Sequence, residues 1–159
     1  SGGGSVYAAL GIATVLLMKK FQSEAVVLAD CSSSALIVFA ACQKRIVAPY
    51  ASFLFHPMRW SSEDQARLSA AKSWSKEFSR ITEICESFLV DNLPMQRRTL
   101  RQWMRDERYV SAADLHEMGI ADVMELGEEG VIDIAAGSRE KSRRRRVPAR
   151  SAAKIRRIG

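Results

Sequence analysis

The sequence predicts an α/β fold with a largely parallel sheet, because short apolar segments that favour strands alternate with segments of helical periodicity. The chain has 159 residues, of which 47% are hydrophobic, enough for one domain with a substantial core. The expected strands are residues 24–29, 45–48, 52–56 and 120–126, and the expected helices are residues 6–20, 34–43, 62–93, 96–104 and 112–118.

The first helix is predicted from apolar residues at positions 6, 9, 10, 13, 16 and 17, which follow the helical period. Gly2, Gly3 and Gly4 come directly before it. A glycine-rich loop at a helix start lets backbone N–H groups approach an anion closely. A flexible linker is the alternative interpretation of the glycines.

The stretch from Ala29 to Ala41 is the most informative part of the chain. An apolar segment ends there, Ser32, Ser33 and Ser34 follow, and a second apolar segment then reads as a helix. A sharp turn from a strand into a helix exposes a side-chain oxygen beside free N–H groups, as a serine nucleophile requires. Serine is also a common helix cap, so this stretch alone leaves both interpretations open.

The longest predicted helix begins at a possible capping box formed by Ser62 and Gln65, and it ends before Pro94. Its apolar residues recur at alternating spacings of three and four. They are Ala71, Trp74, Phe78, Ile81, Cys85 and Phe88. This stripe suits packing against another long helix, and it equally suits packing on the core of its own domain.

The net charge of +6 comes from the end of the chain. Residues 138–159 contain ten Lys or Arg and one acidic residue, whereas the preceding part contains 14 basic and 17 acidic residues. The basic tail therefore offers the only electrostatic attraction for nucleic acid. Without interleaved aromatic residues, a solvated or targeting tail is the preferred interpretation.

The three cysteines show no CxxC spacing, which argues against a disulfide framework and a zinc site and favours a reducing, cytoplasmic location. No apolar run approaches the roughly 18 residues of a membrane span, and no signal peptide is recognisable. We therefore expect no membrane partner, no cofactor and no metal.

Four features match the requirements of a serine hydrolase, namely a nucleophile on a turn, a histidine base, an orienting acid and N–H donors for the oxyanion. Ser33 lies at the strand-to-helix turn, and His56 ends a predicted strand. Asp106 and Glu107 lie in a loop, and the glycines precede a helix. The other histidine, His116, lies in a short polar helix, where a solvated role is expected.

Several motifs occur in one order at consistent spacing. They are Ser-Gly-Gly-Gly-Ser-Val at residues 1–6, Ser-Ser-Ala-Leu-Ile-Val-Phe-Ala-Ala at 33–41, Lys-Arg-Ile-Val-Ala-Pro at 44–49, Phe-Leu-Phe-His-Pro at 53–57, and Arg-Tyr-Val-Ser-Ala continuing to Glu-Met-Gly-Ile-Ala-Asp at 108–122. Over roughly residues 1–124, this series resembles the ClpP family, the serine peptidase subunits of Clp proteases.

The resemblance implies a ClpP/crotonase-like fold, a ββα superhelix with a long protruding handle helix. By the same resemblance, Ser33 attacks the peptide carbonyl and His56 is the base. The backbone N–H groups of Gly3 and Ser34 form the oxyanion hole. The acid of the family lies two residues before an aromatic residue, which selects Glu107 by counting back from Tyr109; a shift of one residue selects Asp106.

Two departures from the family pattern concern the site. Ala29 to Ser32 lack the glycine that usually precedes the nucleophile, and Met58 to Glu63 replace a glycine-rich substrate-binding strand. The N-terminal segment of the family is also absent, so the chain resembles a divergent, N-terminally truncated member. We expect a peptidase domain at 1–126, a linker at 127–137 and a basic, disordered tail at 138–159.

The implied function is that of an ATP-dependent serine endopeptidase subunit that hydrolyses unfolded polypeptides. The resemblance further implies heptameric rings stacked through handle helices, fed by an AAA+ unfoldase. One alternative is a catalytically weak or inactive scaffold subunit of a mixed ring, which the changed substrate strand and Glu107 favour. The other is a crotonase-like acyl-CoA enzyme, against which Ser33 and His56 argue.

Overall fold

A computed structural model describes residues 1–18, 22–61 and 67–125 of the chain. The helices are α1 (Val6–Met18), α2 (Ala35–Ala41), α3 (Leu68–Asn92), α4 (Arg97–Arg105) and α5 (Ala112–Glu117). The strands are β1 (Glu24–Val27), β2 (Asp30–Ser32), β3 (Lys44–Val47), β4 (Ser52–Phe55), β5 (Arg108–Ser111) and β6 (Asp122–Val123). Residues 1–125 form one compact unit. The expected linker and basic tail lie outside the described residues.

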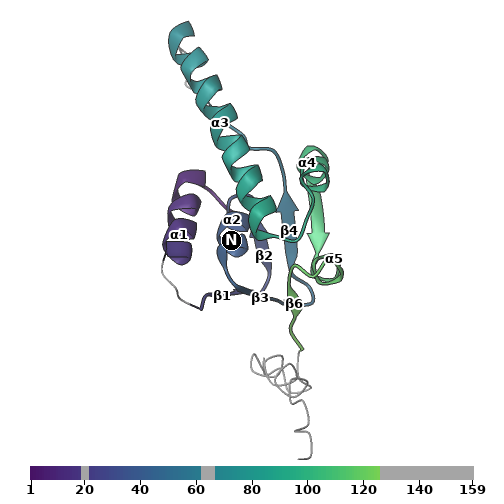
Figure 1. Ribbon diagram of the computed structural model, residues 1–159. Coiled ribbons are helices and arrows are strands. Elements are labelled where there is room, and N and C mark those ends of the chain that lie inside the picture. The colour runs from purple at the N-terminus through teal and green to yellow at the C-terminus, as the bar shows by residue number, and fades with distance from the viewer. Residues whose placement is uncertain (19–21, 62–66, 126–159) are drawn as a thin grey trace, which may run out of the picture. The chain divides into compact units, whose positions relative to one another are not determined.

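Two three-stranded sheets form the centre of this unit (Figure 1). One sheet has the order β1-β3-β6 with all strands parallel, and the other has the order β2-β4-β5. In the second sheet β2 and β4 are parallel, whereas β5 is antiparallel to β4. The α/β class and the mainly parallel pairing predicted from the sequence are therefore confirmed.

The predicted strand at 24–29 is in fact two short strands in different sheets. β1 ends at Val27, and β2 begins at Asp30. Between them the chain bends, and Leu28 is half exposed despite its apolar side chain. The apolar run suggested one continuous strand because hydrophobicity alone does not show where a chain changes sheets.

The helices α1, α2 and α3 share a small apolar cluster beside the main core. It consists of Ala9, Ala13, Ile37, Ala41, Ile81 and Cys85. Small residues on α1 and α2 allow the two helix backbones to approach closely. A hydrogen bond from Tyr7 Oη to Glu77 Oε1 (3.0 Å) adds a polar contact between α1 and α3.

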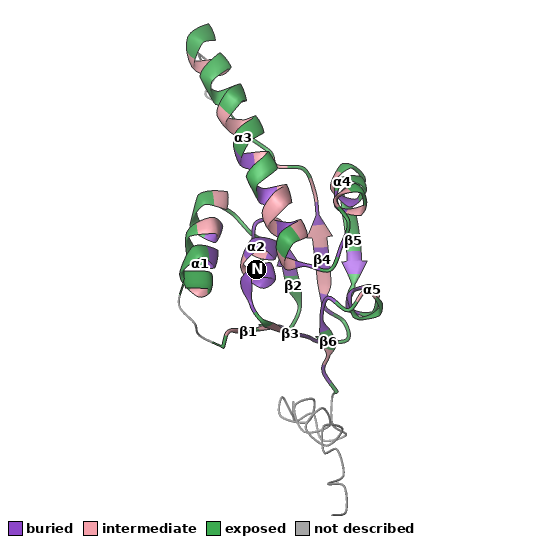
Figure 2. Ribbon diagram, in the orientation of Figure 1, coloured by how far each residue is buried: buried purple, intermediate pink, exposed green. Residues whose placement is uncertain are grey.

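The two halves of α3 have different environments (Figure 2). Ile81, Cys85 and Leu89 in the C-terminal half are buried, whereas Trp74 remains 38% exposed in the N-terminal half. The N-terminal half extends away from the sheets (Figure 1). The apolar stripe therefore packs on the core of its own domain along only part of its length. The predicted capping residues Ser62 and Gln65 lie outside the described residues.

Two serines precede short helices but contribute differently. Ser111 forms a capping box with Asp114 at the start of α5. Ser34 occupies the N-cap position of α2, yet its side chain makes no capping hydrogen bond. Helix capping by its hydroxyl therefore does not account for the serine-rich turn. None of the described helices has both the length and the apolar character that crossing a membrane requires.

Candidate active site

Ser33 lies in the tight turn between β2 and α2 and has an unusual backbone conformation. Its φ angle is +59°, in the left-handed region that non-glycine residues rarely adopt. Its N–H donates to the carbonyl of Leu54 in β4 (3.0 Å), and its carbonyl accepts from Leu36 N–H in α2 (3.1 Å). A serine held in a strained strand-to-helix turn is the geometry of a nucleophile elbow.

Gly3 packs directly against this turn. A Cβ atom added to Gly3 would lie 2.7 Å from both the Ser33 Cβ and the Ser32 carbonyl oxygen, and 3.0 Å from the Ser34 nitrogen. Gly3 also has a φ angle of +88°. Only glycine fits this close approach without strain. The structure thus places the backbone of Gly3 beside the nitrogen of Ser34 and the side chain of Ser33, while the Gly3 N–H donates to Ser1 Oγ at 3.3 Å.

His56 follows the last residue of β4, and its imidazole is oriented by a backbone group. His56 Nδ1 lies 2.7 Å from the carbonyl oxygen of Pro57. A carbonyl oxygen only accepts hydrogen bonds, so Nδ1 carries the proton in this contact. In the neutral ring Nε2 then has a free lone pair, which is the form that a general base needs.

The strand order places the three predicted catalytic positions at the same end of the strands of one sheet. Ser33 follows β2 and His56 follows β4, so both stand at the carboxyl ends of parallel strands. Glu107 directly precedes the antiparallel β5, whose Arg108 pairs with Phe55. His56 directly follows and Glu107 directly precedes this last pair of the register, and Glu107 itself lies in a turn. β4 therefore lies between the strands that carry the other two positions.

The carboxylate of Glu107 is bound by Arg59. Arg59 Nη2 lies 2.8 Å from Oε1 and 2.7 Å from Oε2. Glu107 has a φ angle of +46°, and both side chains are exposed. Asp106 is the C-cap residue of α4, and its N–H donates to the carbonyl of Gln102 (3.0 Å). Neither acidic residue lines the pocket that contains Ser33 and His56.

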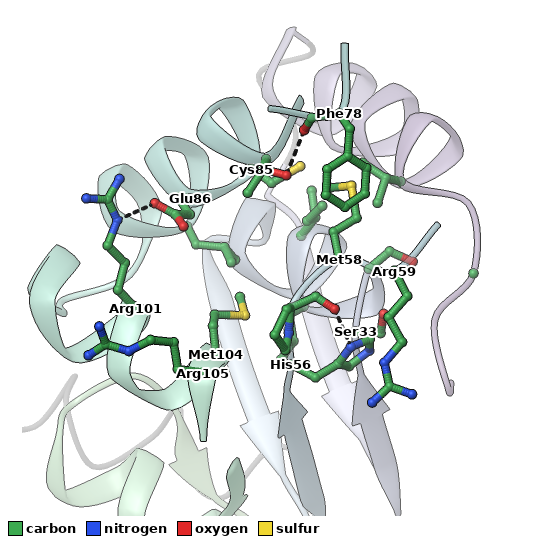
Figure 3. Close-up of a pocket in the computed structure, with 18 residues that line it drawn as sticks. Ser33, His56, Met58, Arg59, Phe78, Cys85, Glu86, Arg101, Met104 and Arg105 are labelled. Carbon is green, nitrogen blue, oxygen red and sulfur yellow. Dashed lines mark hydrogen bonds and ion pairs between the residues drawn. The ribbon is translucent and has the colours of Figure 1, made fainter. Parts of the chain in front are cut away.

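A pocket of about 560 Å³ contains Ser33, Ser34 and His56 (Figure 3). Its apolar lining comes mainly from α1, α2, α3 and the segment after β4. The apolar residues are Val6, Leu36, Ile37, Pro57, Met58, Phe78, Cys85, Leu89 and Met104. This volume lies within the range of small-ligand pockets and can hold the side chain of a bound peptide.

The pocket also has a charged side, formed by α3 and α4 (Figure 3). Arg101 Nε lies 2.7 Å from Glu86 Oε2, and Arg101 Nη2 lies 3.0 Å from Glu83 Oε2. The hydrogen bond and charge of Glu86 raise the pKa of Arg101 further. Arg105 lines the same side. Sequence reasoning missed these residues because α4 reads as a polar surface helix, and only its packing shows which side faces the pocket.

The neighbouring cysteines and Ser32 are poor candidates for the nucleophile. Burial, the larger effect, raises the pKa of the Cys31 thiol to about 12, and burial also raises the pKa of Cys85. Both thiols are therefore protonated near neutral pH and lack the thiolate that reacts. Ser32 is buried, and its hydroxyl donates to the Asp30 carboxylate. Ser33 and Ser34 both line the pocket, and the left-handed backbone of Ser33 distinguishes it from Ser34, whose backbone has ordinary helical geometry.

His116 lies on α5, and its Nδ1 is 3.1 Å from the carbonyl oxygen of Ala121. It is exposed and does not line the pocket, in agreement with its predicted role outside the site. Across the described ranges, the side chains of His, Cys, Asp and Glu form no group of three or more that could hold a metal ion.

The family model described as Clp protease matches residues 1–126 of the chain. No curated protein matches the sequence. The matched residues include every position of the pocket and all the described helices and strands.

Proposed function

Because the chain belongs to the Clp protease family, we propose that it is a serine endopeptidase subunit that cleaves unfolded polypeptides with Ser33 and His56. The family membership confirms the resemblance found in the ordered motifs of the sequence. It also supports peptidase chemistry at the pocket. The particular residues are our inference from the motif positions and the geometry, and the partners are our inference from the family.

In this mechanism, Ser33 Oγ attacks the carbonyl carbon of the substrate while its proton passes to His56 Nε2. The N–H groups of Gly3 and Ser34 stabilise the negative oxygen of the tetrahedral intermediate. His56 then returns the proton to the leaving amine, and a water molecule hydrolyses the acyl-enzyme by the same steps. Glu107 is the proposed acid that stabilises the protonated imidazole, with Asp106 as the alternative.

One observation carries this proposal most strongly. Ser33 is held at a φ angle of +59° in a pocket that it shares with His56, and the backbone of Gly3 packs against it. Backbone strain of this kind persists where the surrounding structure enforces it, commonly at active sites. A helix-capping serine would need neither the strained conformation nor the close approach of a glycine.

A fluorophosphonate probe, which phosphonylates activated serines, tests the proposal on the full chain. We expect labelling of Ser33, with loss in both Ser33→Ala and His56→Ala. We also expect peptide hydrolysis to fall by roughly 10⁶-fold in Ser33→Ala, the cost of removing the nucleophile of a catalytic triad. His116→Ala is the matched histidine control, and it should retain wild-type labelling.

Labelling that persists in Ser33→Ala would contradict the assignment and transfer it to Ser32 or Ser34. Mass spectrometry of the labelled peptide identifies the modified serine directly. Circular dichroism of each variant shows whether the fold is retained, so that loss of labelling can be attributed to chemistry.

A non-catalytic scaffold subunit of a mixed ring is the second candidate. It is favoured by the pairing of Glu107 with Arg59, because the carboxylate in this arrangement does not orient His56. Absence of labelling in a folded and assembled wild-type chain would select this candidate.

The proposed assembly is a homo-oligomer of heptameric rings that stack through the N-terminal half of α3. An AAA+ unfoldase would deliver unfolded chains to it in the cytoplasm. Support comes from the exposed apolar positions along this half of α3, where Leu68 is 72% exposed. Nucleic-acid binding would be confined to the basic residues 138–159.

A further inference from the structure

The ion pair between Arg59 and Glu107 joins two segments that both adjoin the catalytic histidine. Arg59 is three residues after His56 in the chain, and Glu107 directly precedes Arg108, which pairs with Phe55, the neighbour of His56. Arg59 also lines the pocket. The arginine therefore binds the carboxylate near the end of β4 that His56 follows.

His56 has a substitute partner in this arrangement. Its Nδ1–H donates to the Pro57 carbonyl at 2.7 Å, while both oxygens of Glu107 accept from Arg59 at 2.8 and 2.7 Å. A neutral carbonyl orients the ring and fixes its tautomer. It stabilises a protonated imidazole less than a carboxylate does, because charge-assisted hydrogen bonds are the stronger ones.

Resting on the function proposed above, we infer that Arg59 is a positioning residue that controls whether Glu107 can reach His56. With the ion pair formed, the site holds a serine and a histidine oriented by a backbone carbonyl. With the ion pair broken, Glu107 accepts the Nδ1–H of His56 and completes the triad.

Because the Arg59–Glu107 ion pair is exposed, Glu107 can leave Arg59 and bind His56 at little cost. The side chains of Arg59 and Glu107 are 69% and 51% exposed, so water solvates both charges when they separate. Exposed ion pairs are weak and sensitive to salt. An extended substrate or a neighbouring subunit that binds Arg59 would release the carboxylate at the moment when the site is occupied.

The test compares Arg59→Gln with the wild-type full chain by two measurements. The first is the rate at which a fluorophosphonate labels Ser33. We expect this rate to increase about two- to five-fold, because breaking an exposed ion pair changes the fraction of molecules with a free Glu107 carboxylate by about this factor. The second is the NMR signal of the His56 Nδ1–H proton, which should move downfield when a carboxylate accepts it. The chain has two histidines, so His116 provides an internal reference.

Two further variants assign the effect. Adding Glu107→Gln to Arg59→Gln should cancel both changes, because the released side chain then carries no charge. Arg80→Gln is the matched control, since it removes an exposed arginine that binds Glu77 on α3 at 2.7 and 2.6 Å. It should leave the labelling rate and the His56 signal unchanged.

An unchanged His56 signal in Arg59→Gln overturns the inference, as does an unchanged labelling rate of a reactive Ser33. If Ser33 is not labelled in any variant, the proposed peptidase function fails instead. The NMR signal then still decides whether Arg59 withholds Glu107 from His56.

Discussion

At the scale of single residues, the close packing of Gly3 against Ser33 gives the most direct prediction. Gly3→Ala should abolish fluorophosphonate labelling, because the new Cβ would lie 2.7 Å from the Ser33 Cβ and the Ser32 carbonyl oxygen. Its φ angle of +88° adds backbone strain. The measurement is the second-order labelling rate of Ser33, read together with the unfolding free energy of the variant.

Gly11→Ala is the control for Gly3→Ala. A Cβ at Gly11 would meet no atom within 4 Å, and the residue lies inside α1. We expect this variant to keep wild-type labelling and to gain up to about 1 kcal/mol in unfolding free energy, the difference in helix propensity between the two residues. Normal labelling of Gly3→Ala would show that the reactivity of Ser33 does not require the close packing of the Gly3 backbone against it.

The site residues differ in how far the sequence could predict them. The turn at Ser33 was recognisable because small polar residues interrupt two apolar segments. The pairing of Glu107 with Arg59 was not, since the two residues are 48 positions apart and meet only through the pairing of β4 and β5. Sequence motifs locate positions in the chain, whereas the direction of a long charged side chain depends on its neighbours in space.

At the scale of elements, the capping box of α5 should contribute measurably to stability. Ser111 Oγ accepts from Asp114 N–H at 3.2 Å, and the Asp114 carboxylate accepts from Ser111 N–H at 3.0 Å. We expect Ser111→Ala to lower the unfolding free energy by about 1 kcal/mol, a typical cost of losing an N-cap. Urea unfolding at neutral pH measures this difference.

The same variant should show a defined pH dependence. Hydrogen bonds from Ser111 lower the pKa of Asp114 below its usual value. A lowered pKa in the folded state stabilises the protein above the pKa of the unfolded state, and this contribution disappears as pH falls through the folded value. The difference between Ser111→Ala and wild type should therefore shrink in acid.

A serine inside a helix provides the control for the capping prediction. Ser79 lies within α3, and its hydroxyl donates to the Ser75 carbonyl at 3.0 Å. Ser79→Ala should leave stability unchanged or slightly higher, because such bonds back to the helix do not stabilise it. Equal losses in Ser79→Ala and Ser111→Ala would contradict a specific role of the cap.

The elements themselves were mostly predictable from local pattern, with one instructive exception. Apolar residues at helical spacing predicted α1, and a helix was expected at 112–118, where α5 lies. The division between β1 and β2 was not predictable, because it depends on pairing with β3 in one sheet and β4 in the other. Local pattern determines which residues are extended, and long-range pairing determines which sheet they join.

At the scale of the whole molecule, α3 relates the folded unit to its proposed assembly. Its C-terminal half is buried against the core, and its N-terminal half presents apolar residues without burying them (Figure 2). Trp74 and Trp60 make an edge-to-face contact, with ring centroids 4.9 Å apart. The sequence showed one continuous stripe, and only the fold separates its buried part from the exposed part that we propose for contact with another subunit.

Trp74→Lys should therefore disrupt the assembly while leaving the subunit folded. The tryptophan is 38% exposed and contributes to the apolar surface of the N-terminal half of α3, so a charge there opposes burial between rings. We expect the mass measured by light scattering to fall from that of a stacked pair of rings to that of a single ring or smaller. The circular dichroism spectrum should stay that of the wild type.

Lys76→Ala is the matched control, because it alters an exposed residue in the same half of α3 outside the apolar stripe. It should assemble like the wild type. Retention of the full mass by Trp74→Lys would contradict stacking through this surface, and misfolding of Trp74→Lys would show that the Trp60 contact serves the subunit itself. Peptide hydrolysis measured on the same samples then shows whether the activity of Ser33 depends on the assembly. If the site is competent only beside neighbouring subunits, the hydrolysis rate falls together with the mass of the assembly.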